Sequence, residues 1–594
     1  MDTMQGLKRT KYCGEFTVDD IGKQAVACGW VQKVHDKGML VFIDLRDRTG
    51  ILQLAFDDQT DPELRAKAQT PRAEFVLMAK GTIRRRESVN KKIPTGEIEL
   101  YVEDLRILGR SATPPFEITE TTRVNEELRL KYRYLDLRRG EMQRTMQMRH
   151  KIVKLARDYY DENGFLEIET PILIKSTPEG ARDYLVPSRV QPGSFYALPQ
   201  SPQQYKQLLM LSGYDRYMQV ARCFRDEDLR ADRQPEFTQI DLEMSFVDED
   251  DVMTVNEGFM KRVFQEALGV EVQTPFQRMP YQEAMDRFGS DKPDTRFGLE
   301  LVDLSDLLQN CGFKVFAGAL GTGSVRAINV KGGADKLTRK EIDKLVEFVK
   351  TYRAKGLAYT RLTAESETSS YEKFLSEEEK QAIRARLDAQ TGDVLLIVAD
   401  PDNQTVYDSL GALRCEIAER LGLIPKGVFH FLWVTDFPLF EYSEEEGRYA
   451  AKHHPFTHPA FADLDKLESD PGACKARAYD MVLNGCEVGG GSIRINDPDL
   501  QARMFRALGL DDATVQERFG FLIEAFQYGA PPHGGMAYGL DRLVMLMLEK
   551  ESIRDVIAFP KVKDASCLMC EAPAGVDEKQ LVERGIEVKE EPEA

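Results

Sequence analysis

Two stretches near the middle of the chain decide its fold class: Tyr217-Met-Gln-Val-Ala-Arg-Cys-Phe-Arg225 and Phe237-Thr-Gln-Ile-Asp-Leu-Glu243, separated by a charged loop. Their composition and spacing predict an antiparallel hairpin. Successive side chains of a strand point to opposite faces, so Gln239, Asp241 and Glu243 share one face of the return strand. Such a polar face is costly to bury without partners. The hairpin is therefore either the floor of a ligand site or an exposed, salt-bridged surface.

Two glycine-rich stretches follow later in the chain. In Glu487-Val-Gly-Gly-Gly-Ser-Ile-Arg-Ile495, the glycines allow a ligand or a neighbouring strand to approach the backbone closely, and Arg494 offers a planar fork suited to a carboxylate or phosphate. Gly534-Gly-Met-Ala-Tyr-Gly-Leu-Asp-Arg542 leads into the apolar run Leu543–Leu548. This order puts an arginine at the opening turn of a buried helix, where backbone amides favour anions. A plain turn into a core helix is the alternative.

The composition of the chain is that of a multidomain protein without a membrane or secretory segment. Its 594 residues are 42% hydrophobic and 30% charged, and a chain of this length is expected to form several domains. No apolar run approaches the roughly 18 residues of a membrane span, and charged residues interrupt the first 30 positions. The 9 cysteines are scattered without a disulfide framework, which is typical of a reducing compartment. We expect a cytoplasmic protein.

Residues 25–108 contain five segments rich in β-branched, aromatic and aliphatic residues: Ala25–Val31, Leu40–Leu45, Ile51–Phe56, Phe75–Arg84 and Glu97–Leu108. Five short strands in this length predict a small closed barrel of the OB type, with other all-β packing as the alternative. The net charge of the chain is −19, but residues 1–110 hold 19 Lys and Arg against 17 Asp and Glu. A polyanion would therefore meet less repulsion at this segment than elsewhere.

Together these stretches resemble the class II aminoacyl-tRNA synthetases. Phe224-Arg225-Asp226-Glu227, with Phe237 downstream, is similar to motif 2 of that class. Gly539-Leu-Asp-Arg542 is similar to motif 3, and Gly164-Phe-Leu-Glu-Ile-Glu-Thr-Pro171 to motif 1, the dimer-forming element. Three more blocks extend the resemblance to the bacterial-type aspartyl-tRNA synthetases over essentially the whole chain: Ser176-Thr-Pro-Glu-Gly-Ala-Arg-Asp183, Gln200-Ser-Pro-Gln-Gln-Tyr-Lys206 and His453-His-Pro-Phe456.

The resemblance implies a multidomain α/β protein with an N-terminal OB-type β-barrel, an antiparallel-sheet catalytic core with flanking helices, and an inserted α+β domain. The alternating helical and β pattern around residues 295–420 matches the family's extra domain. The expected parts are an anticodon-binding barrel (1–108), a Pro-marked hinge (109–140), the catalytic core in two parts (141–294 and 421–560), the insertion (295–420) and a C-terminal extension with an acidic tail (561–594).

The resemblance also implies a homodimeric ligase that depends on ATP and Mg²⁺. Such enzymes convert L-aspartate to aspartyl-adenylate and transfer the aspartyl group to the 3′-terminal adenosine of tRNA(Asp), releasing AMP and pyrophosphate. The first step needs no general base, because the α-carboxylate is already ionised near neutral pH. Catalysis then consists of positioning and charge stabilisation during in-line attack at the α-phosphorus.

By resemblance, the nucleotide site has two catalytic arginines, Arg225 on the α-phosphate and Arg542 on the γ-phosphate, while Phe237 stacks on adenine. The other expected ATP contacts are Glu227, Gln234, Glu487, Gly539, Leu540 and Asp541. Asp480 and Glu487 resemble the carboxylates that hold Mg²⁺ on the phosphates, and carboxylate oxygens suit this hard cation. Glu487 is therefore also counted as catalytic.

The aspartate site must distinguish a carboxylate from the amide of asparagine, which has nearly the same shape. Cationic donors can do so, because an amide would leave their charges poorly paired. Arg494 and Lys206 fit this role. The resemblance adds further aspartate contacts: Glu179, Gln203, Arg225, Asp241 and His453.

On the barrel, Phe42 and Gln53 match positions that stack on and hydrogen-bond an anticodon base, although a buried core phenylalanine is the alternative for Phe42. In the family, leucine or histidine at the position of Lys37 is associated with strict or relaxed tRNA choice, and lysine is neither. Two hypotheses therefore stay open. The enzyme charges tRNA(Asp) alone, or it also charges tRNA(Asn) and supplies a downstream amidotransferase.

Three further interpretations are less favoured. Lys206, Arg494 and the large insertion argue against a lysine- or asparagine-type synthetase. A catalytically silent RNA-binding paralogue is disfavoured because the expected catalytic set is complete: Arg225, Glu227, Glu487 and Arg542. Cys567-Leu-Met-Cys570 is a single CxxC pair, for which ordinary thiols are favoured over a zinc or redox site.

Overall fold

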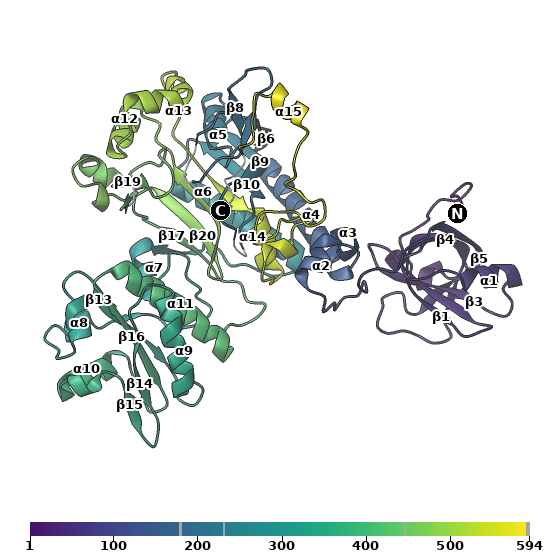
Figure 1. Ribbon diagram of the computed structural model, residues 1–594, viewed down its shortest axis with the longest axis horizontal. Helices are drawn as coiled ribbons and strands as arrows, with labels where there is room; N and C mark the ends of the chain where they lie inside the picture. The colour runs from purple at the N-terminus through teal and green to yellow at the C-terminus, as the bar shows by residue number, and fades with distance from the viewer. Residues whose placement is uncertain (178–180, 230–231, 445–446, 590–594) are drawn as a thin grey trace. The chain divides into compact units, whose positions relative to one another are not determined.

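The computed structural model describes residues 1–177, 181–229, 232–444 and 447–589 (Figure 1). The chain divides into two compact units, residues 1–150 with 554–575 and residues 151–553 with 576–594. Among the described residues, none of the helices has the length and apolar character that a membrane span requires.

The first unit contains a closed barrel with the strand order β1-β2-β3-β5-β4. Its strands are β1 (Gln24–Asp36), β2 (Val41–Arg46), β3 (Ile51–Phe56), β4 (Val76–Arg85) and β5 (Ile98–Gly109), and α1 (Pro62–Ala68) connects β3 to β4. β1 continues five residues beyond the predicted end at Val31. An irregularity in the pairing between Val31 and Lys33 lets the strand continue alongside β2.

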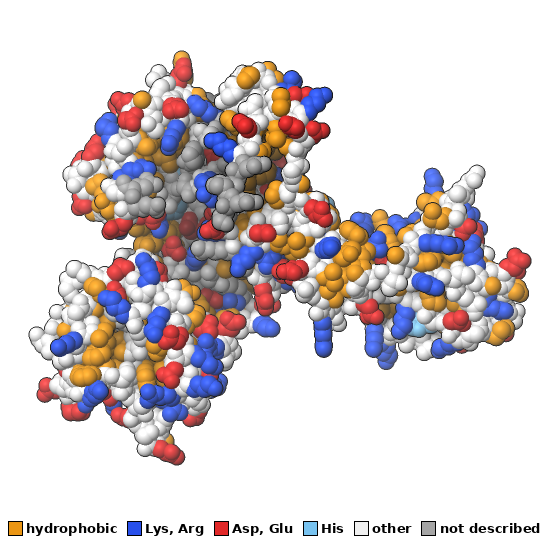
Figure 2. Space-filling view, viewed as in Figure 1, with side chains coloured by type: hydrophobic (Ala, Val, Ile, Leu, Met, Phe, Trp, Pro, Cys, Tyr) orange, Lys and Arg blue, Asp and Glu red, His pale blue; other side chains and the backbone are white. Residues whose placement is uncertain are grey.

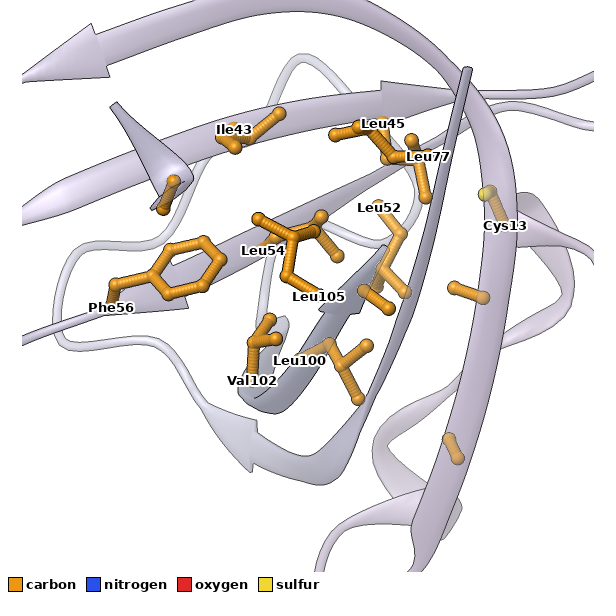
Figure 3. Close-up of a cluster of buried hydrophobic side chains, with 14 of the residues drawn as sticks. Cys13, Ile43, Leu45, Leu52, Leu54, Phe56, Leu77, Leu100, Val102 and Leu105 are labelled. Carbon is orange, nitrogen blue, oxygen red and sulfur yellow. The ribbon is translucent and has the colours of Figure 1, made fainter. Parts of the chain in front are cut away.

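The interior of the barrel is filled by aliphatic side chains that alternate with outward-facing residues. Val41, Ile43 and Leu45 of β2 are 0% exposed, as are Leu52 and Leu54 of β3. Figure 3 shows Ile43, Leu45, Leu52 and Leu54 converging with labelled residues of β4 and β5. Because a closed barrel leaves no free sheet edge, this small domain presents only its outer face and its loops to partners.

The remainder of the first unit is helical. It comprises α2 (Glu126–Lys131), α3 (Arg133–Asp136) and the beginning of α4 (Gly140–Glu162). Arg133 is 2% exposed and donates to the carbonyl oxygens of Ala558 and Ile557, both at 2.8 Å, and to Asp136 Oδ2 at 2.6 Å. These bonds join residues near the C-terminus to α3. α4 ends at Glu162, shortly before Gly164, whose φ is 80°.

The second unit is built on an eight-stranded sheet with the order β11-β17-β20-β21-β22-β10-β9-β6. The strands are β6 (Leu166–Glu167), β9 (Arg216–Phe224), β10 (Glu236–Ser245), β11 (Gln277–Pro280), β17 (Phe431–Thr435), β20 (Ala478–Leu483), β21 (Cys486–Ile493) and β22 (His533–Gly539). All neighbours are antiparallel except β11 with β17 and β6 with β9. Two small hairpins, β7 (Leu185–Pro187) with β8 (Phe195–Ala197) and β18 (Phe440–Ser443) with β19 (Arg448–Ala451), lie outside it.

Helices flank this sheet: α5 (Gln203–Leu211), α6 (Glu249–Leu268), α7 (Tyr281–Phe288), α12 (Pro498–Ala507), α13 (Asp512–Phe526) and α14 (Leu540–Met547), while α15 (Glu578–Glu583) lies near the C-terminus. α6 covers one face. Its Asn256 accepts hydrogen bonds from the hydroxyls of Tyr160 and Tyr538 at 2.9 and 2.8 Å, and its Glu257 accepts one from the Trp433 indole at 2.9 Å. Since Tyr538 alternates with Ala537 along β22, Ala537 belongs to the opposite face.

The inserted domain has its own antiparallel sheet, with the order β12-β13-β16-β14-β15. Its elements are β12 (Val302–Asp303), α8 (Lys314–Ala319), β13 (Ser324–Val330), α9 (Arg339–Lys350), β14 (Ala358–Leu362), β15 (Glu367–Ser369), α10 (Glu377–Arg386), β16 (Val394–Asp400) and α11 (Asn403–Leu421). Alternate residues of β16 pack against α9 and α11 on one face and α8 and α10 on the other. The predicted fold class is confirmed.

Candidate functional site

Two neighbouring rows of side chains form a polar floor across the eight-stranded sheet. The first row pairs Gln219, Asp241, Ala537, Gly490 and Asp480 from strand to strand. In the next row, Glu243 pairs with Gly535, which pairs with Ser492. Directly paired residues present their side chains to the same face. Asp241 and Glu243 are 0% exposed, so the hairpin predicted from sequence is the floor of a site and not an exposed surface.

Glycines on the neighbouring strands make room for these carboxylates. A β-carbon at Gly535 would lie 2.3 Å from Glu243 Oε2, and one at Gly490 would lie 2.5 Å from Asp480 Oδ1. Side chains at either position would displace a carboxylate from the floor. The two glycine-rich stretches therefore allow charged side chains of adjacent strands to lie flat against the sheet.

Four charged side chains form a buried cluster of alternating sign on this floor. Lys206 Nζ, from α5, lies 2.7 Å from Asp241 Oδ1 and 3.4 Å from Glu243 Oε2. Arg494, just after β21, donates from Nε and Nη2 to the two carboxylate oxygens of Glu243 at 2.8 and 3.0 Å. None of these side chains is more than 3% exposed. Each charge is thus compensated inside the protein, as burial requires.

The two carboxylates differ in proton affinity because they face different numbers of cations. Burial raises the pKa of Asp241, and Lys206 offsets this only in part. Glu243 is equally buried, but Arg494 and Lys206 together bring its pKa below the ordinary value. Glu243 is therefore fixed as an anion. Asp241 would be stabilised by one more cation, such as the ammonium group of an amino acid.

Two polar atoms beside this cluster lack partners. Asp241 Oδ2 and Gln203 Nε2 are buried and have no hydrogen-bond partner among the residues described. Leaving such atoms unpaired is costly, so a polar ligand is expected to complete them. Gln203 also lines a small cavity of about 50 Å³. An acceptor and a donor at this position suit the ammonium and carboxylate groups of an α-amino acid.

Two adjacent histidines lie at the edge of the cluster. Arg494 Nη1 lies 2.7 Å from His454 Nε2, so this nitrogen is the unprotonated acceptor. Burial, together with Arg494, His453 and Lys206, holds the pKa of His454 well below its usual value. His453 Nε2 lies 3.7 Å from Asp480 Oδ1, and its buried Nδ1 has no partner in the described part of the chain. The predicted substrate histidine thus lies beside a predicted magnesium carboxylate.

A cleft of about 250 Å³ lies next to this cluster, and Ala537, the partner of Asp241 on β22, is in its wall. Most of the residues predicted for ATP line it: Arg225, Glu227, Gln234, Phe237, Glu487, Gly539, Asp541 and Arg542. Leu540 does not line it. This side chain is 1% exposed and belongs to the core beneath α14, because it follows the N-cap residue Gly539 on the inward side of the helix.

The cleft arginines have few fixed contacts. Arg225 lies over the ring of Phe237, 5.2 Å from its centroid, and its Nε has no hydrogen-bond partner within the described residues. Arg542, in the first turn of α14, donates to the carbonyl oxygen of Glu487 at 2.7 Å and to Asp232 Oδ2 at 3.2 Å. By contrast, Asp541 Oδ2 accepts the backbone N–H of Thr238 at 3.0 Å, which ties α14 to β10.

Asp480 and Glu487 fit a divalent cation by donor chemistry and by proximity. A β-carbon at Gly490 would lie 2.5 Å from Asp480 Oδ1 and 3.4 Å from Glu487 Oε1, so both carboxylates border the same residue. Burial and Asp480 raise the pKa of Glu487, although Arg542 and Lys292 oppose this. Two such carboxylates attract a proton or a cation. No group of three potential metal ligands occurs among the described residues, so phosphate or water would complete the coordination.

The residues predicted to bind the anticodon lie on the barrel surface. Phe42 is half-buried and alternates with the core residues Val41 and Ile43, so it belongs to the outer face. Gln53 lies on the same face, is 7% exposed and donates to Glu99 Oε2 at 3.1 Å. Lys37 is exposed in the turn after β1. The interpretation of Phe42 as a core residue is therefore wrong. An outward-facing aromatic ring suits a single-stranded nucleic acid.

Some site residues escaped the sequence analysis, and one predicted residue cannot be placed. Glu243 was visible only as part of an alternating pattern, while Asp232 and Lys292 belong to no recognised motif and enter the cleft through the fold. Glu179 lies outside the described residues. Cys567 is buried and Cys570 is exposed, and both are free thiols.

Comparisons with known proteins agree with this architecture. Residues 25–108 match the family model described as "OB-fold nucleic acid binding domain", and residues 125–563 match "tRNA synthetases class II (D, K and N)". The aspartate–tRNA ligase of Ruminiclostridium cellulolyticum is 62% identical over 99% of this chain and 100% of its own length. The chain belongs to the aspartate–tRNA ligase family. It is therefore an enzyme, a class II aminoacyl-tRNA synthetase.

Other members and structural neighbours extend the comparison. The aspartate–tRNA(Asp/Asn) ligase of Caldanaerobacter subterraneus subsp. tengcongensis is 58% identical over 99% of both chains. Among solved structures, the aspartyl-tRNA synthetase of Entamoeba histolytica has a TM-score of 0.57 at 21% identity, covering 94% of this chain and 92% of its own. The asparaginyl-tRNA synthetase of Pyrococcus horikoshii complexed with asparaginyl-adenylate has a TM-score of 0.58 at 20% identity, covering 93% and 98%. These two structures share the fold of this aspartate–tRNA ligase family member.

Proposed function

We propose that this chain activates L-aspartate with ATP and transfers the aspartyl group to the 3′-terminal adenosine of tRNA(Asp). The buried cluster of Lys206, Asp241, Glu243 and Arg494 carries the proposal. It places two cations beside two unpaired polar atoms, Asp241 Oδ2 and Gln203 Nε2, and next to a cleft of about 250 Å³. The names of the two relatives described above support the same substrate.

In the first step, an oxygen of the aspartate α-carboxylate attacks the α-phosphorus, the bond from that phosphorus to the bridging oxygen breaks, and pyrophosphate leaves. Arg225 would hold the α-phosphate and Arg542 the γ-phosphate, where positive charge stabilises the transition state. Asp480 and Glu487 would hold Mg²⁺, which neutralises phosphate charge when bound. Asp241 and Gln203 would orient the amino acid, and no side chain has to remove a proton.

Selection against asparagine would follow from the charge of the cluster. The side-chain carboxylate of aspartate adds an anion next to Lys206 and Arg494, whereas an amide would turn N–H donors toward cationic donors. The cost of such a mismatch is about 1–3 kcal/mol for each unpaired group. Because the cluster is buried, water cannot relieve it.

The barrel would read the anticodon, with Phe42 stacking on a base and Gln53 and Lys37 nearby. On the face shown in Figure 2, lysine and arginine side chains are spread over the barrel, which favours binding of a polyanion.

A second candidate function is the charging of tRNA(Asn) as well as tRNA(Asp). It is favoured by the names of several relatives at 57–58% identity, which include both tRNAs.

We also propose a cytoplasmic homodimer that assembles through the segment similar to motif 1. Leu166, Ile172 and Leu173 in or just after this segment are 50%, 47% and 52% exposed. β6, which contains Leu166, is the edge strand of the large sheet. Exposed apolar side chains along a sheet edge indicate a protein interface.

The test is aminoacylation of separate aspartate and asparagine tRNA transcripts by the purified protein, with Mg-ATP and L-aspartate in excess. Charging of the first alone would support the main proposal, and comparable charging of both would support the second. If neither is charged, both proposals fail.

Phe42→Ala should lower kcat/KM for the tRNA by about 10–100-fold, as expected for one stacked base, and should leave aspartate-dependent exchange of pyrophosphate into ATP unchanged.

A further inference from the structure

The inserted domain reaches the nucleotide cleft through one segment, residues 290–299, which follows α7. The end of α7 packs tightly on α11 of the inserted domain, since a β-carbon at Gly411 would lie 2.4 Å from the carbonyl oxygen of Gly289. Arg414 of α11 is 1% exposed and points at the segment. Its guanidinium donates to the carbonyl oxygens of Asp294, Phe297, Gly298 and Leu299 at 3.1, 3.2, 2.7 and 3.3 Å.

The other side of this segment packs against the hairpin that carries Glu487. A β-carbon at Gly485, in the turn between β20 and β21, would lie 3.0 Å from the β-carbon of Asp294. Thr295 Oγ1 lies 3.4 Å from His430 Nδ1. Residues 290–299 are therefore fixed between the inserted domain and the catalytic sheet.

Lys292 is the residue that this segment brings to the cleft. It lines the cleft together with Arg225, Glu487 and Arg542. Lys292 is exposed and, among the residues that the structure describes, forms no ion pair, whereas Arg542 contacts Asp232. Because Arg542 and Glu487 line the same cleft, Lys292 lies near the predicted phosphate and magnesium groups.

We propose that Lys292 binds the β- and γ-phosphates of ATP and the pyrophosphate as it leaves, and that Arg414 is a positioning residue through which the inserted domain holds Lys292 in place. The inference rests on the proposed function of the cleft. An ammonium group is a compact charge suited to a polyphosphate. It acts where negative charge accumulates as the bond to the α-phosphorus breaks. The inserted domain thereby takes part in the first step of the reaction.

The test compares two ligands that differ in the pyrophosphate group. Lys292→Ala should raise the Kd of Mg-ATP about tenfold or more, as expected for the loss of a charge-assisted hydrogen bond. A non-hydrolysable aspartyl-adenylate analogue lacks the pyrophosphate group that Lys292 would bind. Its Kd should therefore stay within about twofold of the wild-type value. Lys336→Ala, at an exposed lysine within the inserted domain, is the matched control. Equal weakening of both ligands, or unchanged ATP binding, would overturn the inference.

The positioning role of Arg414 is tested by a double-mutant cycle. Arg414→Gln should also weaken Mg-ATP binding selectively, and the double variant with Lys292→Ala should bind ATP no more weakly than Lys292→Ala alone. Additive losses in the free energy of ATP binding would show that Arg414 acts independently of Lys292 and would overturn its positioning role. Arg414→Lys provides the comparison if the glutamine variant does not fold. Aspartate-dependent pyrophosphate exchange by the wild type distinguishes a failure of the proposed function from a failure of this inference. Its absence would refute the proposed function, whereas an active enzyme with no role for Lys292 refutes only this inference.

Discussion

The amino-acid pocket and the nucleotide cleft share one sheet but are organised in opposite ways. In the pocket, Lys206 and Arg494 are already bonded to carboxylates and are 3% and 2% exposed. In the cleft, Arg542 is 28% exposed and its carboxylate partner Asp232 is 47% exposed. The cations of the pocket are therefore paired before any substrate binds, whereas the cleft arginine must exchange a surface partner for a ligand.

This difference follows from what each region has to recognise. Aspartate and asparagine have nearly the same shape, so the pocket needs fixed charges in a dry environment where a wrong group cannot find water. ATP brings several negative charges of its own, and exposed cations can reorganise around them at little cost because surface ion pairs are weak. Variants in the pocket should therefore affect both folding and activity, while variants in the cleft should affect activity alone.

The largest effect is expected for Arg494→Leu. This change leaves the carboxylate of Glu243 buried beside Lys206 alone, and breaking a buried pair costs about 3–5 kcal/mol. Aspartate-dependent exchange of pyrophosphate into ATP should fall by at least about a thousandfold. The melting temperature, measured by differential scanning fluorimetry, should fall as well. If the variant were as active as the wild type, Arg494 would have no role in the selection of aspartate. If its melting temperature were unchanged, variants of the pocket would not differ from variants of the cleft in their effect on folding.

Arg542→Ala is expected to have a smaller effect and to leave the fold intact. Removal of one charge-stabilising group typically lowers a rate by about 100–1000-fold, so adenylate formation measured by pyrophosphate exchange should slow by that order. Because Arg542 is partly exposed and its carboxylate partner Asp232 lies at the surface, the melting temperature should stay close to that of the wild type. tRNA affinity, measured by filter binding, should also be retained. Equal losses of exchange and tRNA affinity would refute this division between the two substrates.

The two regions were also unequally predictable from the sequence. The barrel strands followed from segments rich in β-branched, aromatic and aliphatic residues, and the shared face of Asp241 and Glu243 followed from the period of two along a strand, because both are properties of neighbouring residues. The pairing of Glu243 with Arg494 joins positions 251 residues apart. Only the strand register of the folded sheet brings them together.

Residues of the cleft show the limit of motif-based prediction. Arg225, Phe237 and Arg542 belong to recognisable motifs, whereas Lys292 enters the cleft because a distant helix fixes its segment through Arg414. The side chain of Leu540, although inside a binding motif, faces the core, since adjacent positions on a helix point in different directions, and its contact with ATP stays a prediction. Ion pairs of the cleft such as Arg542 with Asp232 depend on loop conformation and leave no sequence signal.

The smallest expected effect concerns pH and again separates the two regions. His454 in the pocket has a pKa well below its usual value because it is buried near Arg494, His453 and Lys206. The folded protein keeps it neutral, whereas the unfolded chain binds a proton below about pH 6.5. Stability should therefore fall as the pH drops from 7 to 5, with a slope that approaches about 1.4 kcal/mol per pH unit for this one group below pH 6.5. His458 and His533, whose pKa values are also lowered, should act in the same direction.

His454→Asn, which keeps an acceptor for Arg494, should show a shallower decline of melting temperature over this range. Identical declines in the two proteins would mean that His454 is charged in the folded enzyme, and that the pocket is not the closed, water-free environment that its selectivity for aspartate requires.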